Sequence, residues 1–175
     1  MLSDSEPHTS GYSVWLTFGR AEKELAKLIA QLSRRLNTPV FRPHITLAGQ
    51  INAGSRSLLE ITSWLASVTD PFKVRCTQFG SEPSWFRTLF LEVALSTPLR
   101  DLRKLTEKHL PLANPSFLPH ISLVYGNLED KTRNQIISEL DSMLPFSADV
   151  TAITIMKTEG PAPVWHPIKE FELGN

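Results

Sequence analysis

The pentapeptide PHITL at residues 43–47 returns almost unchanged as PHISL at residues 119–123. Each copy follows an apolar strand-like segment and a helix-like segment. Such an internal repeat of a strand-helix-strand unit predicts two related lobes that face each other across a pseudo-twofold axis. The histidines of the two copies, His44 and His120, would then meet in the cleft between the lobes.

Side chains within each pentapeptide alternate between two faces. Residues two apart on a strand point the same way, so His44 lies beside Thr46, and His120 lies beside Ser122. In-line hydrolysis of a phosphodiester needs a base for the attacking water, an acid for the departing oxygen and donors for the nonbridging oxygens. Imidazoles and hydroxyls supply these groups near neutral pH. The repeat therefore predicts two catalytic histidines and two hydroxyls that bind substrate.

Helix-like and strand-like segments alternate along the rest of the chain. Residue spacing predicts strands at 12–18, 72–79, 87–93, 149–157 and 163–173, and helices at 25–36, 55–69, 97–105 and 129–144. Residues 1–11 are polar and lack periodicity, so we expect a flexible N-terminal tail there. Residues 12–175 are expected to form a single bilobal catalytic domain.

Composition limits the classes of function. The 175 residues are 41% hydrophobic, which fits one globular domain. The formal net charge is zero, so no overall field gathers a long nucleic-acid polymer. A single cysteine fits a reducing compartment, and no apolar run reaches the roughly 18 residues that a membrane span needs. We expect a cytoplasmic monomer that does not bind membranes and acts on a small ligand.

Other catalytic classes lack their motifs. Neither pentapeptide has a nearby carboxylate that could complete a zinc site, and HExxH is missing from the sequence. The sequence also lacks GxxxxGK[ST], the phosphate-binding loop, and GxSxG, the serine-hydrolase elbow. We therefore expect neither a metal nor a cofactor.

Two side chains near the first repeat are further candidates for substrate binding. Trp15 lies on the polar face of the strand at 12–18, where it could stack on a base or simply pack. Arg42 has the same parity as His44 and could reach a phosphate, although a surface role is equally open.

A further aromatic candidate lies near the second repeat. Tyr125 has the opposite parity to His120, so it reaches the cleft only if the strand ends or bulges near Val124. Trp85 and Phe86 lie in a predicted loop that could close over substrate or cover the sheet edge.

The paired motifs resemble those of the two-histidine phosphoesterase superfamily, whose hallmark is two H-x-[ST]-x motifs on facing strands. Within residues 12–173, YSVWL, RPHITLA and LPHISLVYG look most like the cyclic phosphodiesterases of plants and fungi, which process the ADP-ribose cyclic phosphate left by transfer-RNA splicing. The resemblance implies an α+β fold with two pseudo-twofold-related lobes of antiparallel sheet and outer helices around a central cleft. It also implies that Trp15 and Tyr125 contact the cleft.

The resemblance implies metal-independent hydrolysis of ADP-ribose 1″,2″-cyclic phosphate or nucleoside 2′,3′-cyclic phosphates to the monoester. His120 would activate water and His44 would protonate the leaving oxygen. Two alternatives stay open. One is an enzyme that trims or joins RNA ends through a 2′,5′ or 3′-terminal phosphodiester, and the other is a noncatalytic nucleotide-binding module that keeps the cleft.

Overall fold

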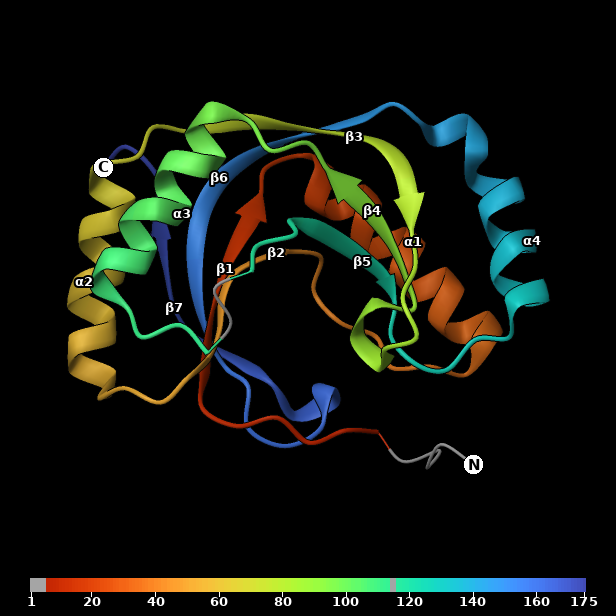
Figure 1. Cartoon of the computed structure of the whole chain (residues 1–175), viewed down its shortest axis with the longest axis horizontal. Coiled ribbons are helices and arrows are strands. Elements are labelled where there is room, and N and C mark those ends of the chain that lie inside the picture. Colours follow the sequence, from red (N-terminus) through yellow and green to blue (C-terminus); the bar gives the residue numbers. More distant parts are fainter. Residues whose placement is uncertain (1–5, 114–115) are drawn as a thin grey trace.

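The structure is a computed structural model that describes residues 6–113 and 116–175 (Figure 1). Its helices and strands, in chain order, are β1 (Tyr12–Phe18), α1 (Ala21–Leu36), β2 (Ile45–Ile51), α2 (Ser55–Ser67), β3 (Phe72–Gly80), η1 (Trp85–Arg87), β4 (Leu89–Val93), α3 (Thr97–His109), β5 (His120–Val124), α4 (Asp130–Leu140), η2 (Asp141–Met143), β6 (Phe146–Lys157), η3 (Ala162–Val164) and β7 (His166–Glu172). The predicted α+β class is confirmed.

The seven strands of the described residues form one antiparallel sheet, with the order β2-β1-β6-β3-β4-β5 and with β7 also paired to β6. The long strand β6 joins two halves of this sheet. Its residues 150–157 pair with β1, and residues 152–157 also pair with β7 on the other side, whereas residues 146–150 pair with β3. The two predicted lobes are therefore halves of one continuous sheet, one holding β2 and the other β5.

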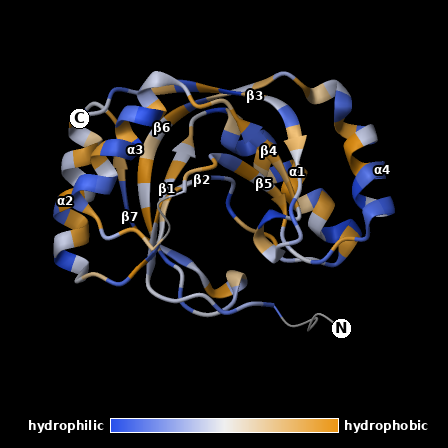
Figure 2. Cartoon of the chain, viewed as in Figure 1, coloured by the Kyte–Doolittle hydropathy of each residue, from blue (hydrophilic) through white to orange (hydrophobic). Residues whose placement is uncertain are grey.

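Four α-helices in the described part of the chain cover the outside of the sheet (Figure 1). Helix α1 packs on β5, α2 packs on β6 and β7, and α3 packs on β2. Hydrophobic residues concentrate on the strands, whereas the helices alternate hydrophobic and hydrophilic stretches (Figure 2). None of the helices within residues 6–113 and 116–175 is both long and apolar enough to span a bilayer.

The pentapeptides place their apolar side chains in the core. Ile45 and Leu47 of the first repeat, and Ile121 and Leu123 of the second, are all fully buried in one hydrophobic cluster. Because side chains alternate across a strand, the histidine and hydroxyl of each repeat lie on the opposite face. This burial fixes the register and aims the polar face of both motifs away from the core.

Residues 6–11, part of the predicted N-terminal tail, lie against the segment that follows β6. Thr9 exchanges two backbone hydrogen bonds with Gly160, at 3.2 and 3.0 Å, and its hydroxyl donates to the carbonyl of Thr158 at 2.5 Å. Such backbone pairing requires no apolar periodicity, which is why the pattern of side chains gives no sign of it. Residues 1–5 of the predicted tail lie outside the described residues.

Candidate active site

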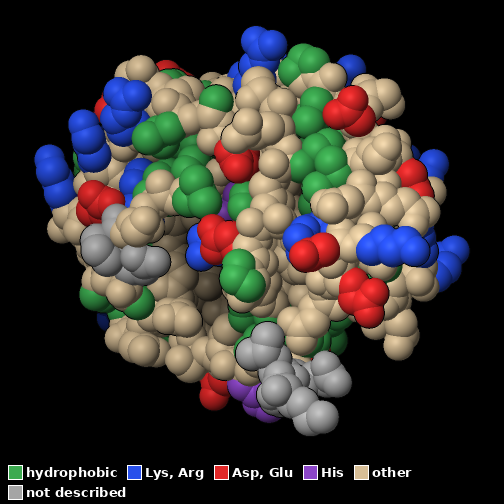
Figure 3. Space-filling model, turned by 45° about the vertical axis from the view of Figure 1, so that its right-hand side comes forward, with side chains coloured by type: hydrophobic (Ala, Val, Ile, Leu, Met, Phe, Trp, Pro, Cys, Tyr) green, Lys and Arg blue, Asp and Glu red, His purple; other side chains and the backbone are tan. Residues whose placement is uncertain are grey.

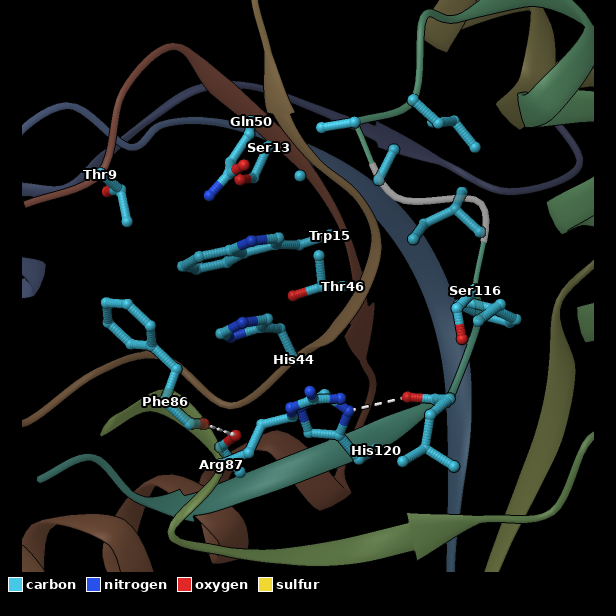
Figure 4. Close-up of a pocket in the computed structure, with 18 of the residues that line it drawn as sticks. Thr9, Ser13, Trp15, His44, Thr46, Gln50, Phe86, Arg87, Ser116 and His120 are labelled. Carbon is cyan, nitrogen blue, oxygen red and sulfur yellow. Dashed lines mark hydrogen bonds between the residues drawn. The ribbon is translucent and has the colours of Figure 1, made fainter. Parts of the chain in front are cut away.

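A pocket of about 360 Å³ is lined by both halves of the sheet (Figure 4). It brings together the four side chains that the repeat singles out, together with both predicted aromatic contacts. These residues are His44, Thr46, His120, Ser122, Trp15 and Tyr125. Segments that are far apart in sequence thus supply one site, as the pseudo-twofold repeat predicts.

The two imidazoles are held in the same way. Nδ1 of His44 lies 2.6 Å from the carbonyl oxygen of Arg42. Nδ1 of His120 lies 2.8 Å from the carbonyl oxygen of Leu118, a bond that Figure 4 marks with a dashed line. A carbonyl oxygen only accepts, so each Nδ1 carries the proton and donates it. In the neutral tautomer Nε2 is therefore the basic nitrogen of each ring, free to exchange a proton in the pocket.

Burial controls the charge of both rings. Burial lowers the pKa of His44 from 6.5 to about 3, and the positive charges of His120 and Arg42 add to this effect. Burial also lowers the pKa of His120, where the neighbouring charge of Arg87 acts in the same direction. Without a ligand, both imidazoles are therefore neutral at neutral pH.

This burial predicts a specific loss of stability in acid. A histidine with a lowered folded-state pKa contributes stability above its unfolded value near 6.5, and this contribution is lost as the pH falls toward about 3. His44→Asn keeps a donor for the Arg42 carbonyl but cannot be protonated. Between pH 6.5 and about pH 4, we expect the free energy of unfolding of wild type to fall by about 3 kcal/mol more than that of the variant.

Urea denaturation at a series of pH values measures this difference. The exposed His166 provides the matched control, and His166→Asn should follow the wild-type curve. Parallel curves for wild type and His44→Asn would show that the folded protein tolerates a charged His44.

The two hydroxyls are not equivalent. The Ser122 hydroxyl is buried and donates to the carbonyl of Phe86 at 2.8 Å, so its proton is already used. The Thr46 hydroxyl lines the pocket and makes no hydrogen bond within the described part of the chain. In this state Thr46 can donate to a phosphate oxygen, whereas Ser122 holds η1 against β5 and can only accept.

The two predicted aromatic contacts both line the pocket but are almost completely buried. Trp15 is 2% exposed and stacks on His44, and Tyr125 is 3% exposed and stacks on Phe41. Tyr125 reaches the pocket because β5 ends at Val124, which is the condition that its parity required.

Arg42 has a different setting from the predicted phosphate contact. It is not among the residues that line the pocket. Its guanidinium bonds to Glu22 at 2.7 Å and to Glu170 at 2.8 Å. Two carboxylates from α1 and β7 thus neutralise this arginine, and its contribution to the site is the backbone carbonyl that orients His44.

The pocket also contains residues that sequence reasoning missed or left undecided. Arg87 lies beside His120 (Figure 4) and is held by Glu82 at 2.6 Å. The half-buried Phe86 and Trp165 form an aromatic wall with ring centroids 5.6 Å apart. Thr9, Ser13, Gln50 and Arg103 also line it. For Phe86, the sequence indicated a place in the pocket only through its position in a predicted loop that could close over substrate. Arg87 and Trp165 carry no periodicity that could place them here.

Metal ligation has no visible basis in the described residues. Within residues 6–113 and 116–175, no three histidine, cysteine or carboxylate side chains cluster as a metal site would require. Both histidines direct Nδ1 at a backbone carbonyl, and none of the described residues that line the pocket is a carboxylate.

A family model for the 2′-5′ RNA ligase superfamily matches residues 22–162, which include both pentapeptides. The chain belongs to the 2′-5′ RNA ligase superfamily. Membership of this superfamily confirms the two-histidine phosphoesterase family that the repeated motif indicated, while the closeness to plant and fungal cyclic phosphodiesterases stays a prediction. Among curated proteins, no sequence matches the chain.

Solved structures share the fold of this superfamily member. The protein TT0787 of Thermus thermophilus is 15% identical, with 94% of this chain and 98% of that chain covered and a TM-score of 0.61. E. coli LigT complexed with 3′-AMP is 14% identical, with 97% of this chain and 100% of the LigT chain covered and a TM-score of 0.60. LigT complexed with ATP is 17% identical, with 98% of this chain and 100% of the LigT chain covered and a TM-score of 0.60. At these identities the likeness establishes the common fold.

Proposed function

We propose that the protein hydrolyses the cyclic phosphodiester of a nucleotide-like substrate to a monoester, with His44 and His120 as the acid and base. The observation that carries this proposal is the matched anchoring of the two imidazoles. Each Nδ1 donates to a backbone carbonyl, and each ring leaves Nε2 free in the same pocket. Two such groups are what in-line hydrolysis of a phosphodiester requires.

The proposed reaction transfers two protons. Nε2 of neutral His120 takes a proton from water while the water oxygen attacks phosphorus. The bond between phosphorus and the ribose oxygen breaks, and Nε2–H of His44, which is charged once the substrate phosphate lies beside it, protonates that leaving oxygen. The Thr46 hydroxyl donates to a nonbridging oxygen, where negative charge must be held. Exchange with solvent then restores the two protonation states.

Three observations support a small substrate. The pocket volume of about 360 Å³ lies at the lower end of the range of roughly 300–1,000 Å³ that is usual for small-ligand sites. Positive and negative side chains are interspersed on the face shown in Figure 3, so this face offers no basic groove for a long polymer. E. coli LigT, which shares the fold, was solved with the mononucleotide 3′-AMP. We therefore propose nucleoside 2′,3′-cyclic phosphates and ADP-ribose 1″,2″-cyclic phosphate as substrates, acting in RNA metabolism.

The family description favours one second candidate. A 2′-5′ RNA ligase superfamily member could act on the ends of RNA through the same pair of histidines. An RNA substrate would extend beyond the pocket, and its further phosphates would need positively charged side chains there. A mononucleotide substrate needs no such contacts. A rate on a short RNA with a terminal phosphodiester that exceeds the rate on the mononucleotide would favour RNA ends.

The direct test uses the wild-type protein, a nucleoside 2′,3′-cyclic phosphate and excess EDTA. We expect the cyclic phosphate to be converted to one monoester, followed by phosphorus NMR, at a rate that the chelator does not change. The reason is that the histidines and Thr46 supply every group that the proposed steps use. Activity that disappears with EDTA and returns with zinc or magnesium would contradict the metal-independent mechanism. A lack of turnover on every cyclic phosphate tested would contradict the proposed function.

A further inference from the structure

The indole of Trp15 lies flat on the imidazole of His44. Their ring centroids are 3.5 Å apart and their planes differ by 4° (Figure 4). Trp15 is 2% exposed and His44 is 6% exposed, so this stack is shielded from water. The contact is built by β1 and β2, because Trp15 pairs directly with Thr46 across the two strands.

Trp15 therefore lacks the free surface that a nucleobase would need. His44 covers one face of the indole, and Trp165 packs near it edge-on at a centroid distance of 6.1 Å. A side chain that stacks bases must present an open face. Phe86 and Trp165, which line the pocket and are half-buried, keep more aromatic surface available than Trp15 does.

We propose that Trp15 is a positioning residue that fixes the plane of His44 and stabilises its charged form during proton transfer. This inference rests on the proposed function. The bond from Nδ1 to the Arg42 carbonyl fixes one edge of the imidazole, and the indole fixes its plane. Together they determine the direction of Nε2. The face of an indole also attracts a cation, so the stack favours imidazolium over neutral imidazole.

Besides Trp15, the Arg42 carbonyl favours the charged form of His44 by accepting from its Nδ1, whereas burial and the nearby positive charges act against that form. Burial lowers its pKa, and the positive charges of Arg42 and His120 lower it further. None of the described residues that line the pocket is a carboxylate that could stabilise the imidazolium of His44. The stack on Trp15 supplies part of that stabilisation instead. The carboxylates beyond the Arg42 side chain are Glu22 and Glu170.

The first test separates kcat from KM. Trp15→Leu should lower kcat by on the order of 10²-fold, the cost of misplacing a catalytic group by about 1 Å, with KM within about 3-fold of wild type. Trp15→Phe restores an aromatic face and should recover most of kcat. Trp64 and His109 form the matched control, because this exposed pair has ring centroids 4.7 Å apart outside the pocket. Trp64→Leu should leave both constants unchanged.

A rise in KM with unchanged kcat in Trp15→Leu would overturn the proposal and make Trp15 a base platform. A second measurement needs neither a variant nor turnover. In wild-type protein, nuclear Overhauser contacts between the Trp15 and His44 rings should persist when 3′-AMP is added. Their loss would show that the base displaces the imidazole, and this too would overturn the proposal. Because it requires no turnover, this result is independent of whether the protein hydrolyses cyclic phosphates.

The pKa of His44 gives a readout that a merely structural role would not change. NMR titration with inorganic phosphate present should give a pKa in Trp15→Leu that is lower than in wild type by about half a unit to one unit, the size expected for a lost cation–π contact. Trp15→Phe should restore the wild-type value. An unchanged pKa in folded Trp15→Leu would contradict stabilisation of the imidazolium.

Discussion

Turnover of a nucleoside 2′,3′-cyclic phosphate should fall by roughly 10²–10⁴-fold in His44→Ala and in His120→Ala, because general acid-base catalysis is worth about that much. The structure gives the physical reason. Each ring carries its proton on Nδ1 and leaves Nε2 as the only nitrogen that can exchange one in the pocket. The other titratable side chains among the described pocket residues are Arg87, Arg103 and Tyr125. The arginines stay charged, and burial raises the pKa of Tyr125, so none of the three can replace either imidazole near neutral pH.

Steady-state kinetics of the purified variants measure this loss, and circular dichroism confirms the fold. His109→Ala and His166→Ala are the matched controls, because both rings are exposed and lie outside the pocket lining. They should retain wild-type turnover. A folded His44→Ala or His120→Ala variant with wild-type rates would eliminate the acid-base mechanism.

The repeated pentapeptide was sufficient to predict which side chains meet in the pocket. Ile45 and Ile121 are fully buried, so the parity of a strand places the neighbouring histidines on the opposite face. Burial of an apolar side chain fixes the register because a slip of one residue would expose it. The same reasoning gave the correct condition for Tyr125, which reaches the pocket where β5 ends.

Parity predicts a face but not what covers it. Trp15 lies on the predicted face, yet His44 occupies the indole surface that a base would need. Arg42 also has the expected parity, but its charge is taken by carboxylates from α1 and β7, which the sequence places far away. Arg87 lies in η1 without any periodicity, so only the folded loop shows that it lies beside His120.

The surroundings of the two histidines support different roles for them. Burial lowers the pKa of both histidines, and at His120 the charge of Arg87 adds to this effect, so the neutral form of His120, which can accept a proton from water, is favoured. His44 is more deeply buried, and a buried imidazolium interacts strongly with a substrate phosphate because the local dielectric is low. The stack on Trp15 favours the same charged form. We therefore expect His44 to be the acid once substrate is bound.

A substrate with an activated leaving group, such as a nitrophenyl phosphodiester of the nucleotide, separates the two roles. Its leaving oxygen departs without a proton, so His44→Ala should recover to within about 10-fold of wild type on this substrate. His120→Ala should stay impaired by roughly 10²–10⁴-fold, because water still needs a base. The measurement is kcat of wild type and of each variant on the natural and the activated substrate, and the ratio of the two values assigns the acid and the base. Recovery of His120→Ala instead would exchange the two assignments, and recovery of neither variant would show that protonation of the leaving oxygen does not limit the reaction.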